Sequence, residues 1–151
     1  MIPNFHNGEN LLTEMVSYNF LKRTPQRGEV IVFRSPEQPN LDFIKRIIAL
    51  PGERIKLENG EVFIVNEDNP GGILLDEPYL EPGTQTTGRR TIKDGEIYTV
   101  PEGNYVVFGD NRERSSDSRE WGPIEKSAIV GRVWLRSWPP EALGIIKPAT
   151  Y

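Results

Sequence analysis

Short apolar segments separated by glycine and proline turns are the feature that most limits how this chain can fold. Val30–Phe33 and Tyr105–Phe108 are uninterrupted β-prone runs, and Pro51-Gly52 ends the apolar run that starts at Leu41. The 151 residues include 14 glycines and 13 prolines, which disfavour long helices because both are poor in helix interiors. The pattern predicts a mainly β protein built from short strands.

The middle of the chain differs from its two ends in amino-acid composition. Arg54–Leu57 and Glu61–Val65 flank Asn59-Gly60, a dipeptide that strongly favours a tight hairpin turn. Polar segments rich in glycine, proline and threonine follow and are typical of loops. We therefore expect a main β core from residues 1–53 and 101–148, a small β insertion at 54–100 and a tail at 149–151. Further strands are expected at Leu11–Tyr18, Gly95–Val100 and Val130–Trp138, and a short helix at Glu141–Ile145.

Composition excludes several classes of site. The net charge of −4 and the pI near 5.1 leave no broad basic face for nucleic acid, and we expect no such partner. The chain has no cysteine, which removes thiol nucleophiles and thiolate metal sites, and its one histidine, His6, lies in a polar, turn-like segment. No apolar run approaches the ~20 residues of a membrane-spanning helix. The N-terminus lacks a signal-peptide pattern, so the chain as given is expected to be soluble.

A lysine interrupts the apolar segment that runs from Leu41 to Leu50. In a strand, the alternation of side chains puts Phe43, Lys45, Ile47 and Ala49 on one face. Burial lowers the pKa of a lysine, and a neutral lysine amine is a general base that can activate a serine hydroxyl without histidine. The alternative is that Lys45 extends to solvent along its aliphatic stem. The strand by itself leaves both possibilities open.

A dense polar block follows the apolar run Tyr105–Phe108. From Gly109 to Gly122 the sequence reads Gly-Asp-Asn-Arg-Glu-Arg-Ser-Ser-Asp-Ser-Arg-Glu-Trp-Gly. Polar loops at the end of a core strand often carry the chemistry of a site, although a solvated turn would have a similar composition. Because the block holds three serines, it could also hold the amine of Lys45 in place.

Together these segments resemble the type I signal peptidases, membrane-bound Ser/Lys proteases that remove signal peptides. The family's lysine strand, Asp-Tyr-Ile-Lys-Arg and then Leu-Pro-Gly-Asp, is similar to Asp42–Arg46 followed by Leu50–Glu53. The family pattern Gly-Asp-Asn-Arg-x-x-Ser-x-Asp-Ser-Arg-x-Trp-Gly matches Gly109–Gly122 at every fixed position. The resemblance runs from Met1 to about Trp138 and includes Arg27–Phe33. It implies a mainly β, signal-peptidase-like catalytic sheet with a small inserted β subdomain.

The resemblance also implies roles for individual residues. Lys45 is expected to be the general base, and Ser115 to hydrogen-bond its amine and orient it. Support of the site is expected from an Asp117–Arg119 ion pair and from Asp110, Asn111, Arg112 and Ser118. An extended substrate is expected to pair with Asp42–Ile44 and to place small side chains in shallow pockets lined by Met1, Phe5, Leu11, Val32, Phe43 and Ile44. No metal or organic cofactor is implied.

The family's nucleophile has no counterpart in the chain. It is the serine of a Ser-Met-x-Pro-Thr-Leu segment, and aligning Met1 and Pro3 with that segment puts the serine immediately before residue 1. Asn4 and Phe5 also replace the family's Thr-Leu. We interpret the sequence as truncated just after the catalytic serine. A domain trimmed to be soluble and a pseudoenzyme that binds signal peptides are the alternatives. The 151-residue chain is expected to show no proteolysis.

The resemblance implies signal peptides of secreted preproteins as substrates. It also implies a full-length protein in the plasma membrane, with the catalytic domain on the outer side. Trp134 and Trp138, near Leu143 and Ile145, are candidates for resting on a lipid surface, with a core or lid position as the alternative, favoured for Trp134. Two rival interpretations are a self-cleaving Ser/Lys repressor-type protease, which usually carries a DNA-binding region, and a β-rich peptide-binding module with an exposed Lys45.

Overall fold

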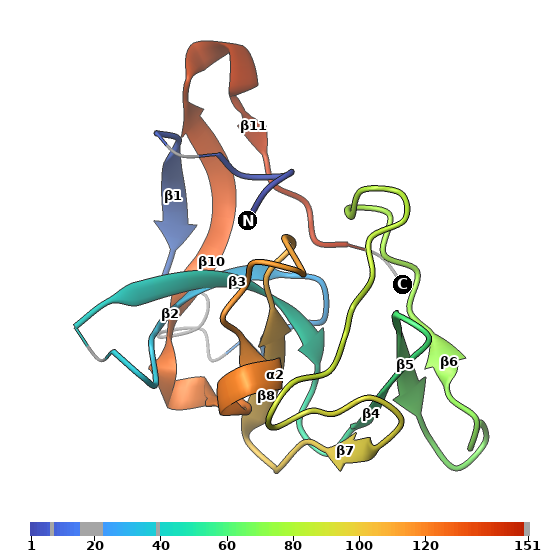
Figure 1. Ribbon diagram of the computed structural model, residues 1–151. Coiled ribbons are helices and arrows are strands. Elements are labelled where there is room, and N and C mark those ends of the chain that lie inside the picture. The colour runs from blue at the N-terminus through green and yellow to red at the C-terminus, as the bar shows by residue number, and fades with distance from the viewer. Residues whose placement is uncertain (7, 16–22, 39, 150–151) are drawn as a thin grey trace.

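The described part of the chain is mainly β, as the sequence predicted. The computed structural model describes residues 1–6, 8–15, 23–38 and 40–149, and strands make up most of their regular structure (Figure 1). The short helical elements are α2 (Ser118–Trp121), η1 (Lys126–Ala128) and η2 (Pro140–Ala142). Among these residues no helix has the length and hydrophobicity needed to cross a membrane.

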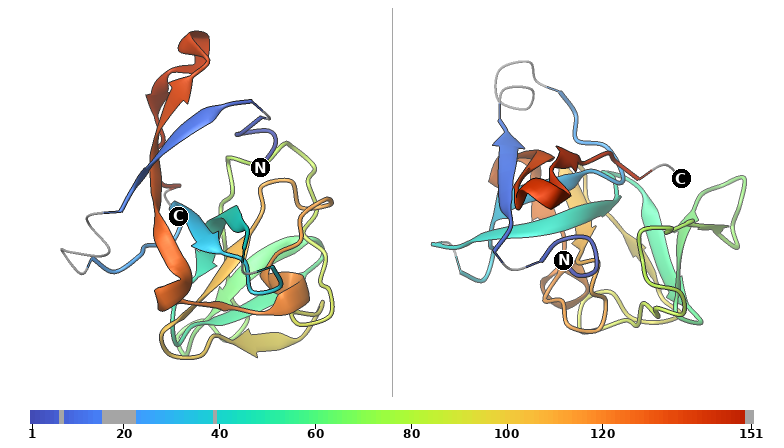
Figure 2. Two further views of the ribbon diagram at one scale, coloured as in Figure 1. Left: turned by 90° about the vertical axis from the view of Figure 1, so that its left-hand side faces the viewer. Right: turned by 90° about the horizontal axis from the view of Figure 1, so that it is seen from above.

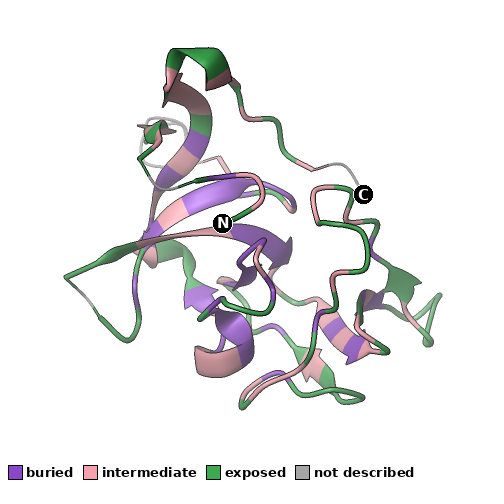
Figure 3. Ribbon diagram, turned by 45° about the horizontal axis from the view of Figure 1, so that its top comes forward, coloured by how far each residue is buried: buried purple, intermediate pink, exposed green. Residues whose placement is uncertain are grey.

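The larger sheet is antiparallel and is built from both ends of the chain. Its strand order is β1-β10-β2-β3-β8-β9, and β11 pairs with the far end of β10 on the edge opposite β1. The strands are β1 (Asn10–Glu14), β2 (Val30–Arg34), β3 (Asp42–Ala49), β8 (Asn104–Phe108), β9 (Ile124–Glu125), β10 (Ile129–Trp138) and β11 (Gly144–Ile145). Its centre, formed by β2, the second half of β3 and β8, is deeply buried (Figure 3).

The smaller sheet comes from the middle of the chain. Its order is β6-β5-β4-β7, formed by β4 (Arg54–Glu58), β5 (Glu61–Val65), β6 (Ile73–Leu74) and β7 (Ile97–Thr99). Asn59 and Gly60 connect β4 to β5 with φ values of 52° and 82°, the left-handed conformation that this dipeptide favours in tight hairpins. The two sheets share one hydrophobic cluster, in which Ile55 and Leu57 of the smaller sheet pack with Val106 and Phe108 of the larger.

The alternation of side chains along β3 holds at its start and fails near its end. Phe43 and Ile47 pack in the same cluster, as a regular strand requires. The pairing with β8 shifts between Ile47 and Ala49, so Ala49 packs in the other cluster, against the smaller sheet. The prediction that Ala49 shares the face of Lys45 is therefore wrong, because a β-bulge adds one residue and reverses the faces beyond it.

The C-terminal segment differs from expectation in two places. The expected helix at Glu141–Ile145 is instead a single 3-10 turn, η2, followed by the strand β11. Trp134 was expected to be a core or lid residue, and its 37% exposure excludes the core position, while Trp138 is 52% exposed. Figure 2 shows this end of β10, flanked by β1 and β11, extending away from the centre of the larger sheet. The expected strand Leu11–Tyr18 ends at Glu14 in the structure, and its residues 16–18 lie outside the described ones.

Candidate active site

Lys45 lies in the middle of β3, where the large sheet surrounds it with apolar side chains. It pairs with Ile31 of β2, and its Nζ atom lies 5.4 Å from the centre of the Phe43 ring. Burial lowers the pKa of Lys45 from its usual 10.5, while the carboxylates of Asp117 and Asp110 oppose the shift and Arg119 adds to it. The side chain is therefore placed to lose its proton more readily than a solvated lysine.

Gly109 brings Ser115 and Lys45 together. Ser115 is 6% exposed, and a Cβ atom added to Gly109 would lie 2.2 Å from its Oγ atom. The same added atom would lie 3.6 Å from Cδ of Lys45, so the serine hydroxyl and the lysine stem approach the same point. The Ser115 hydroxyl is buried and makes no hydrogen bond of good geometry to the described residues, but it lies close enough to Asp117 to lower the pKa of that carboxyl. It therefore lies between the lysine stem and the Asp117 carboxylate.

The first residue of the chain also lies beside Lys45. Burial, followed by the positive charge of Lys45, lowers the pKa of the Met1 amino group, and Asp110 opposes the shift. The Asp110 N–H points at the Met1 sulfur, 3.4 Å away. The Met1 amino group thus lies close enough to Lys45 for the charge of the lysine to affect it.

Asp117 and Arg119 form the expected ion pair, and both side chains are completely buried. Arg119 donates from Nη2 to Asp117 Oδ2 at 2.8 Å and from Nε to Oδ1 at 2.9 Å. Asp117 also accepts from the Gly109 N–H and caps α2 through the Arg119 N–H. Burial by itself raises the pKa of Asp117. The hydrogen bond and the charge of Arg119, together with the Ser115 hydroxyl and the Gly109 N–H, outweigh the effect of burial, so the pKa of Asp117 is lowered. The pair holds the loop against the end of β8.

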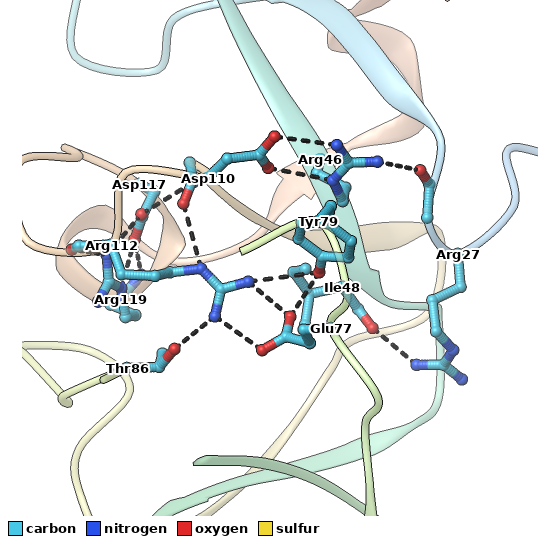
Figure 4. A network of polar contacts seen from close by, with 12 residues as sticks. Arg27, Arg46, Ile48, Glu77, Tyr79, Thr86, Asp110, Arg112, Asp117 and Arg119 are labelled. Atoms are coloured by element: carbon cyan, nitrogen blue, oxygen red, sulfur yellow. Dashed lines mark hydrogen bonds and ion pairs between the residues drawn. The ribbon is translucent and has the colours of Figure 1, made fainter. Parts of the chain in front are cut away.

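A second buried ion pair fixes the turn that follows β8. Arg46 donates to Asp110 from Nε at 3.0 Å and from Nη2 at 2.9 Å, and its Nη1 donates to the Gly28 carbonyl (Figure 4). The ring of Tyr79 lies 4.0 Å from the Arg46 guanidinium carbon. Arg46 points to the opposite side of β3 from Lys45, so the same strand supplies both the lysine and an anchor for the polar block.

Arg112 connects the polar block to the loop after β6. Its guanidinium, completely buried, donates to Glu77 Oε2 at 3.0 Å and to the Thr86 hydroxyl, and its Nε donates to the Gly109 carbonyl (Figure 4). The charge and hydrogen bonds of Glu77 outweigh the effect of burial and raise the pKa of Arg112. Sequence reasoning missed Glu77 and Tyr79. A buried arginine calls for a carboxylate, but nothing in the linear sequence indicates which one.

Two other expected support residues have local partners. The Ser118 hydroxyl accepts the Val107 N–H at 2.9 Å, which ties α2 to β8. Asn111 accepts the Arg114 N–H through its side chain at 3.2 Å and so shapes the turn. Both contacts stabilise the loop rather than reach Lys45. His6 lies exposed in the N-terminal segment, as expected.

The apolar residues predicted to bind substrate separate into two groups. Met1, Leu11, Val32 and Ile44 all pack against the cluster that contains Phe5, together with the unexpected Ile146 from the C-terminal segment. Phe43 packs elsewhere, edge-on to Phe33 with ring centres 6.3 Å apart. The structure thus brings most of these side chains together on one side of β3.

The first half of β3 has an open edge. On one side, Asp42–Arg46 pair with Val30–Arg34 of β2. On the other side, β8 pairs only with Arg46, Ile47 and Ala49. Within the described ranges, Asp42–Lys45 therefore have no strand partner on the β8 side, and Asp42 is exposed. Unpaired backbone groups at a strand edge can bind another extended chain.

Comparison with known proteins gives one family. Residues 1–138 match the family model described as signal peptidase, peptidase S26. Signal peptidase I of Leptolyngbya laminosa is 35% identical over 156 residues, covering 98% of this chain and 69% of that protein. The probable signal peptidase I-2 of Synechocystis sp. is 34% identical, with coverage of 97% and 62%. Signal peptidase IB of Staphylococcus aureus is 34% identical, with coverage of 92% and 73%.

A solved structure shows the same relationship. The crystal structure of a signal peptidase I from Enterococcus faecalis V583 is similar with a TM-score of 0.55 and 29% sequence identity, covering 74% of this chain and 97% of that chain. The chain spans 62% to 73% of the length of the three sequence relatives.

Proposed function

Because the chain belongs to the signal peptidase family, peptidase S26, we propose that its site serves the hydrolysis of peptide bonds in signal peptides of exported preproteins. Signal peptidases I are serine endopeptidases, and the mainly β fold is that of the family. The observation that carries the proposal is the convergence on one point of a lysine with a lowered pKa, a buried serine hydroxyl and the N-terminal segment.

Lys45 is the general base of the reaction, and Ser115 orients it. The neutral amine takes the proton of a serine hydroxyl, whose oxygen attacks the substrate carbonyl carbon. The lysine then gives this proton to the departing amine, and an acyl-enzyme remains for water to hydrolyse. Burial supports this role because it favours the neutral amine, and the Ser115 hydroxyl beside the lysine stem can fix the direction of its lone pair.

The substrate lies along the open edge of β3. Its backbone pairs with Asp42–Ile44, and the small side chains before the cut face the apolar cluster around Phe5. Two observations support this arrangement: no described strand pairs with Asp42–Ile44 on the β8 side, and Lys45 comes directly after this segment. An extended signal peptide bound there runs past the lysine amine.

The nucleophile is a serine joined to the nitrogen of Met1. The family motif puts its serine at that place, and the electrostatic effect of Lys45 on the Met1 amino group supports it, because a residue attached to that nitrogen lies beside the base. Its backbone N–H also contributes to the oxyanion hole. These 151 residues accordingly supply the base and its support, and we expect no cleavage by a polypeptide of these residues alone.

The test compares this chain with one that carries a short N-terminal extension ending in serine. Cleavage of a fluorogenic signal-peptide substrate is expected only with the extension. In the extended chain Lys45→Met lowers kcat by about 10²- to 10⁴-fold, the usual contribution of a general base. Lys93→Met, at an exposed lysine of the smaller sheet, leaves the rate unchanged. Lys45-dependent cleavage by the unextended chain would overturn the assignment of the nucleophile, and an inactive extended chain would overturn the proposed function.

We propose a membrane surface as a second partner, and a location of the full-length protein in the plasma membrane with this domain outside. Trp138, Leu143 and Ile145 are all more than half exposed at the end of the β10–β11 hairpin. Tryptophan favours the boundary between lipid and water. Sedimentation with phosphatidylcholine–phosphatidylglycerol vesicles is expected to fall several-fold in Trp138→Ala. Ile97→Ala, which shortens a half-exposed side chain of β7, serves as the control and should bind normally. Equal binding by both variants would rule out the hairpin as the contact.

A further inference from the structure

Asn4 joins the N-terminal segment to two distant parts of the chain. Its side-chain Nδ2 donates to Asp110 Oδ2 and to the Tyr79 carbonyl, both at 2.8 Å. Its own carbonyl accepts from the Arg136 guanidinium of β10. Both partners of the amide nitrogen can only accept hydrogen bonds, so the orientation of the Asn4 amide is fixed by chemistry.

Both partners of the Asn4 side chain are themselves held in place. Asp110 is buried and paired with Arg46 through two hydrogen bonds. Tyr79 lies against the same guanidinium, and its hydroxyl donates to Glu77, which binds Arg112 (Figure 4). The residues that fix Asn4 are therefore the ones that fix the polar block, and two of them, Glu77 and Tyr79, come from the loop after β6.

The position of Asn4 determines the position of Met1. The Phe5 N–H donates to the Met1 carbonyl at 2.9 Å, so the first five residues form one closed turn. Phe5 is buried in its own cluster, while Met1 meets Asp110 and the charge of Lys45. If the Asn4 amide lost its partners, this turn would be free to move relative to the lysine.

We propose that Asn4 is a positioning residue, which, with the Glu77–Tyr79 segment, holds the N-terminal turn against the base. The smaller sheet then takes part in assembling the active site, because its loop supplies one of the two acceptors for Asn4. The consequence for catalysis rests on the proposed function, whereas the positioning itself does not. The signal peptidase motif has threonine at this place, and a threonine hydroxyl has one donor where the Asn4 amide uses two.

The positioning is tested on the 151-residue chain by NMR of ¹³C-methyl methionine. The chain has two methionines, Met1 in the turn and Met15, which is exposed and acts as an internal reference. Asn4→Ala is expected to move the Met1 methyl signal to its unstructured position and leave Met15 unchanged. Asn10→Ala, an exposed asparagine at the start of β1, should move neither signal. An unchanged Met1 signal in folded Asn4→Ala would overturn the proposal.

The catalytic consequence is tested in the serine-extended chain. Displacing a reacting group by about 1 Å can cost about 10² in rate. Asn4→Ala should therefore lower kcat about 10²-fold with little change in KM, Asn4→Thr should fall in between, and Asn10→Ala should match the parent. A rise in KM alone would contradict a positioning role. If the extended parent is inactive, the proposed function fails, and the methionine signals still decide whether Asn4 holds the turn.

Discussion

The polar block Gly109–Gly122 and the smaller sheet are both rich in charged side chains, yet they use them in opposite ways. In the block, Arg112, Asp117 and Arg119 are buried, and each also bonds to backbone groups. In the smaller sheet and its connecting segments, the pairs Lys56–Glu58 and Lys93–Glu96 lie at the surface. Both side chains of the Lys93–Glu96 pair are more than half exposed.

The difference shows what each region depends on. The smaller sheet is stabilised by apolar burial around Ile55, Leu57 and Val62, so its ion pairs are dispensable. In the block the charged side chains are themselves buried, and removing one partner of a buried pair leaves an uncompensated charge. Its ion pairs define a geometry, the placement of Ser115 beside Lys45, that nonspecific apolar packing would not define.

The largest effect is expected from breaking the ion pair beneath the active-site loop. Asp117→Ala leaves the buried Arg119 guanidinium without its carboxylate and should lower the free energy of unfolding by about 3–5 kcal/mol. Urea denaturation followed by tryptophan fluorescence measures the change. Asp68→Ala, which removes the carboxylate of an exposed loop residue, should change it by less than about 0.5 kcal/mol. Equal losses in the two variants would mean that the block is not distinguished by its buried charge.

A methyl group at Gly109 is expected to have the next largest effect. The added atom would lie 2.2 Å from Ser115 Oγ and 2.7 Å from Ser115 Cβ, so the serine must move. Gly109→Ala should lower the free energy of unfolding by about 1–3 kcal/mol, as overpacking in a filled core does. Gly71→Ala is the matched control, because Gly71 is exposed with no atom near the new methyl group. A neutral Gly109→Ala would show that the loop is not closely packed against the lysine.

The buried lysine should appear in the pH dependence of stability. The pKa of Lys45 in the folded chain is lowered from 10.5, so between the lowered value and 10.5 the unfolded chain binds more protons. The free energy of unfolding therefore rises with pH across this window, by about 1.36 kcal/mol for each unit of lowering. Lys45→Met should remove this rise, whereas Lys93→Met, at an exposed position, should retain it. Identical pH profiles for the two variants would show that Lys45 titrates like a solvated lysine.

The smallest effect belongs to the surface pair of the smaller sheet. Lys56 Nζ and Glu58 Oε1 are 2.8 Å apart on β4, with the glutamate side chain 43% exposed. A double-mutant cycle of Lys56→Ala and Glu58→Ala should give a coupling of less than about 1 kcal/mol that weakens further in salt. A coupling as large as the loss in Asp117→Ala would erase the contrast between the two regions.

The strands and the family could be predicted from sequence because their signals are local. The β-prone runs, the Asn59-Gly60 hairpin and the alternation that singles out Lys45 involve residues within a few positions of one another. The motif around Lys45 and the motif around Ser115 are each an unbroken stretch of sequence, and both lie within the segment that matches the signal peptidase family. The errors arose where neighbours in space decide, as at the bulge before Ala49 and in Glu141–Ile145, where a 3-10 turn and a short strand replace the expected helix.

The sequence by itself determined which side chains this protein brings to its site, namely a lysine in an apolar strand and a serine-rich polar loop. Only the tertiary structure decided how they are held. Arg112 pairs with Glu77, which is 35 positions away in the sequence, and Asn4 donates to Asp110, which is 106 positions away. Propensities and turn signals act over a few residues, whereas a buried charge or amide takes whichever partner the sheet topology brings within about 3 Å. That choice depends on the whole fold and is not encoded in any one segment.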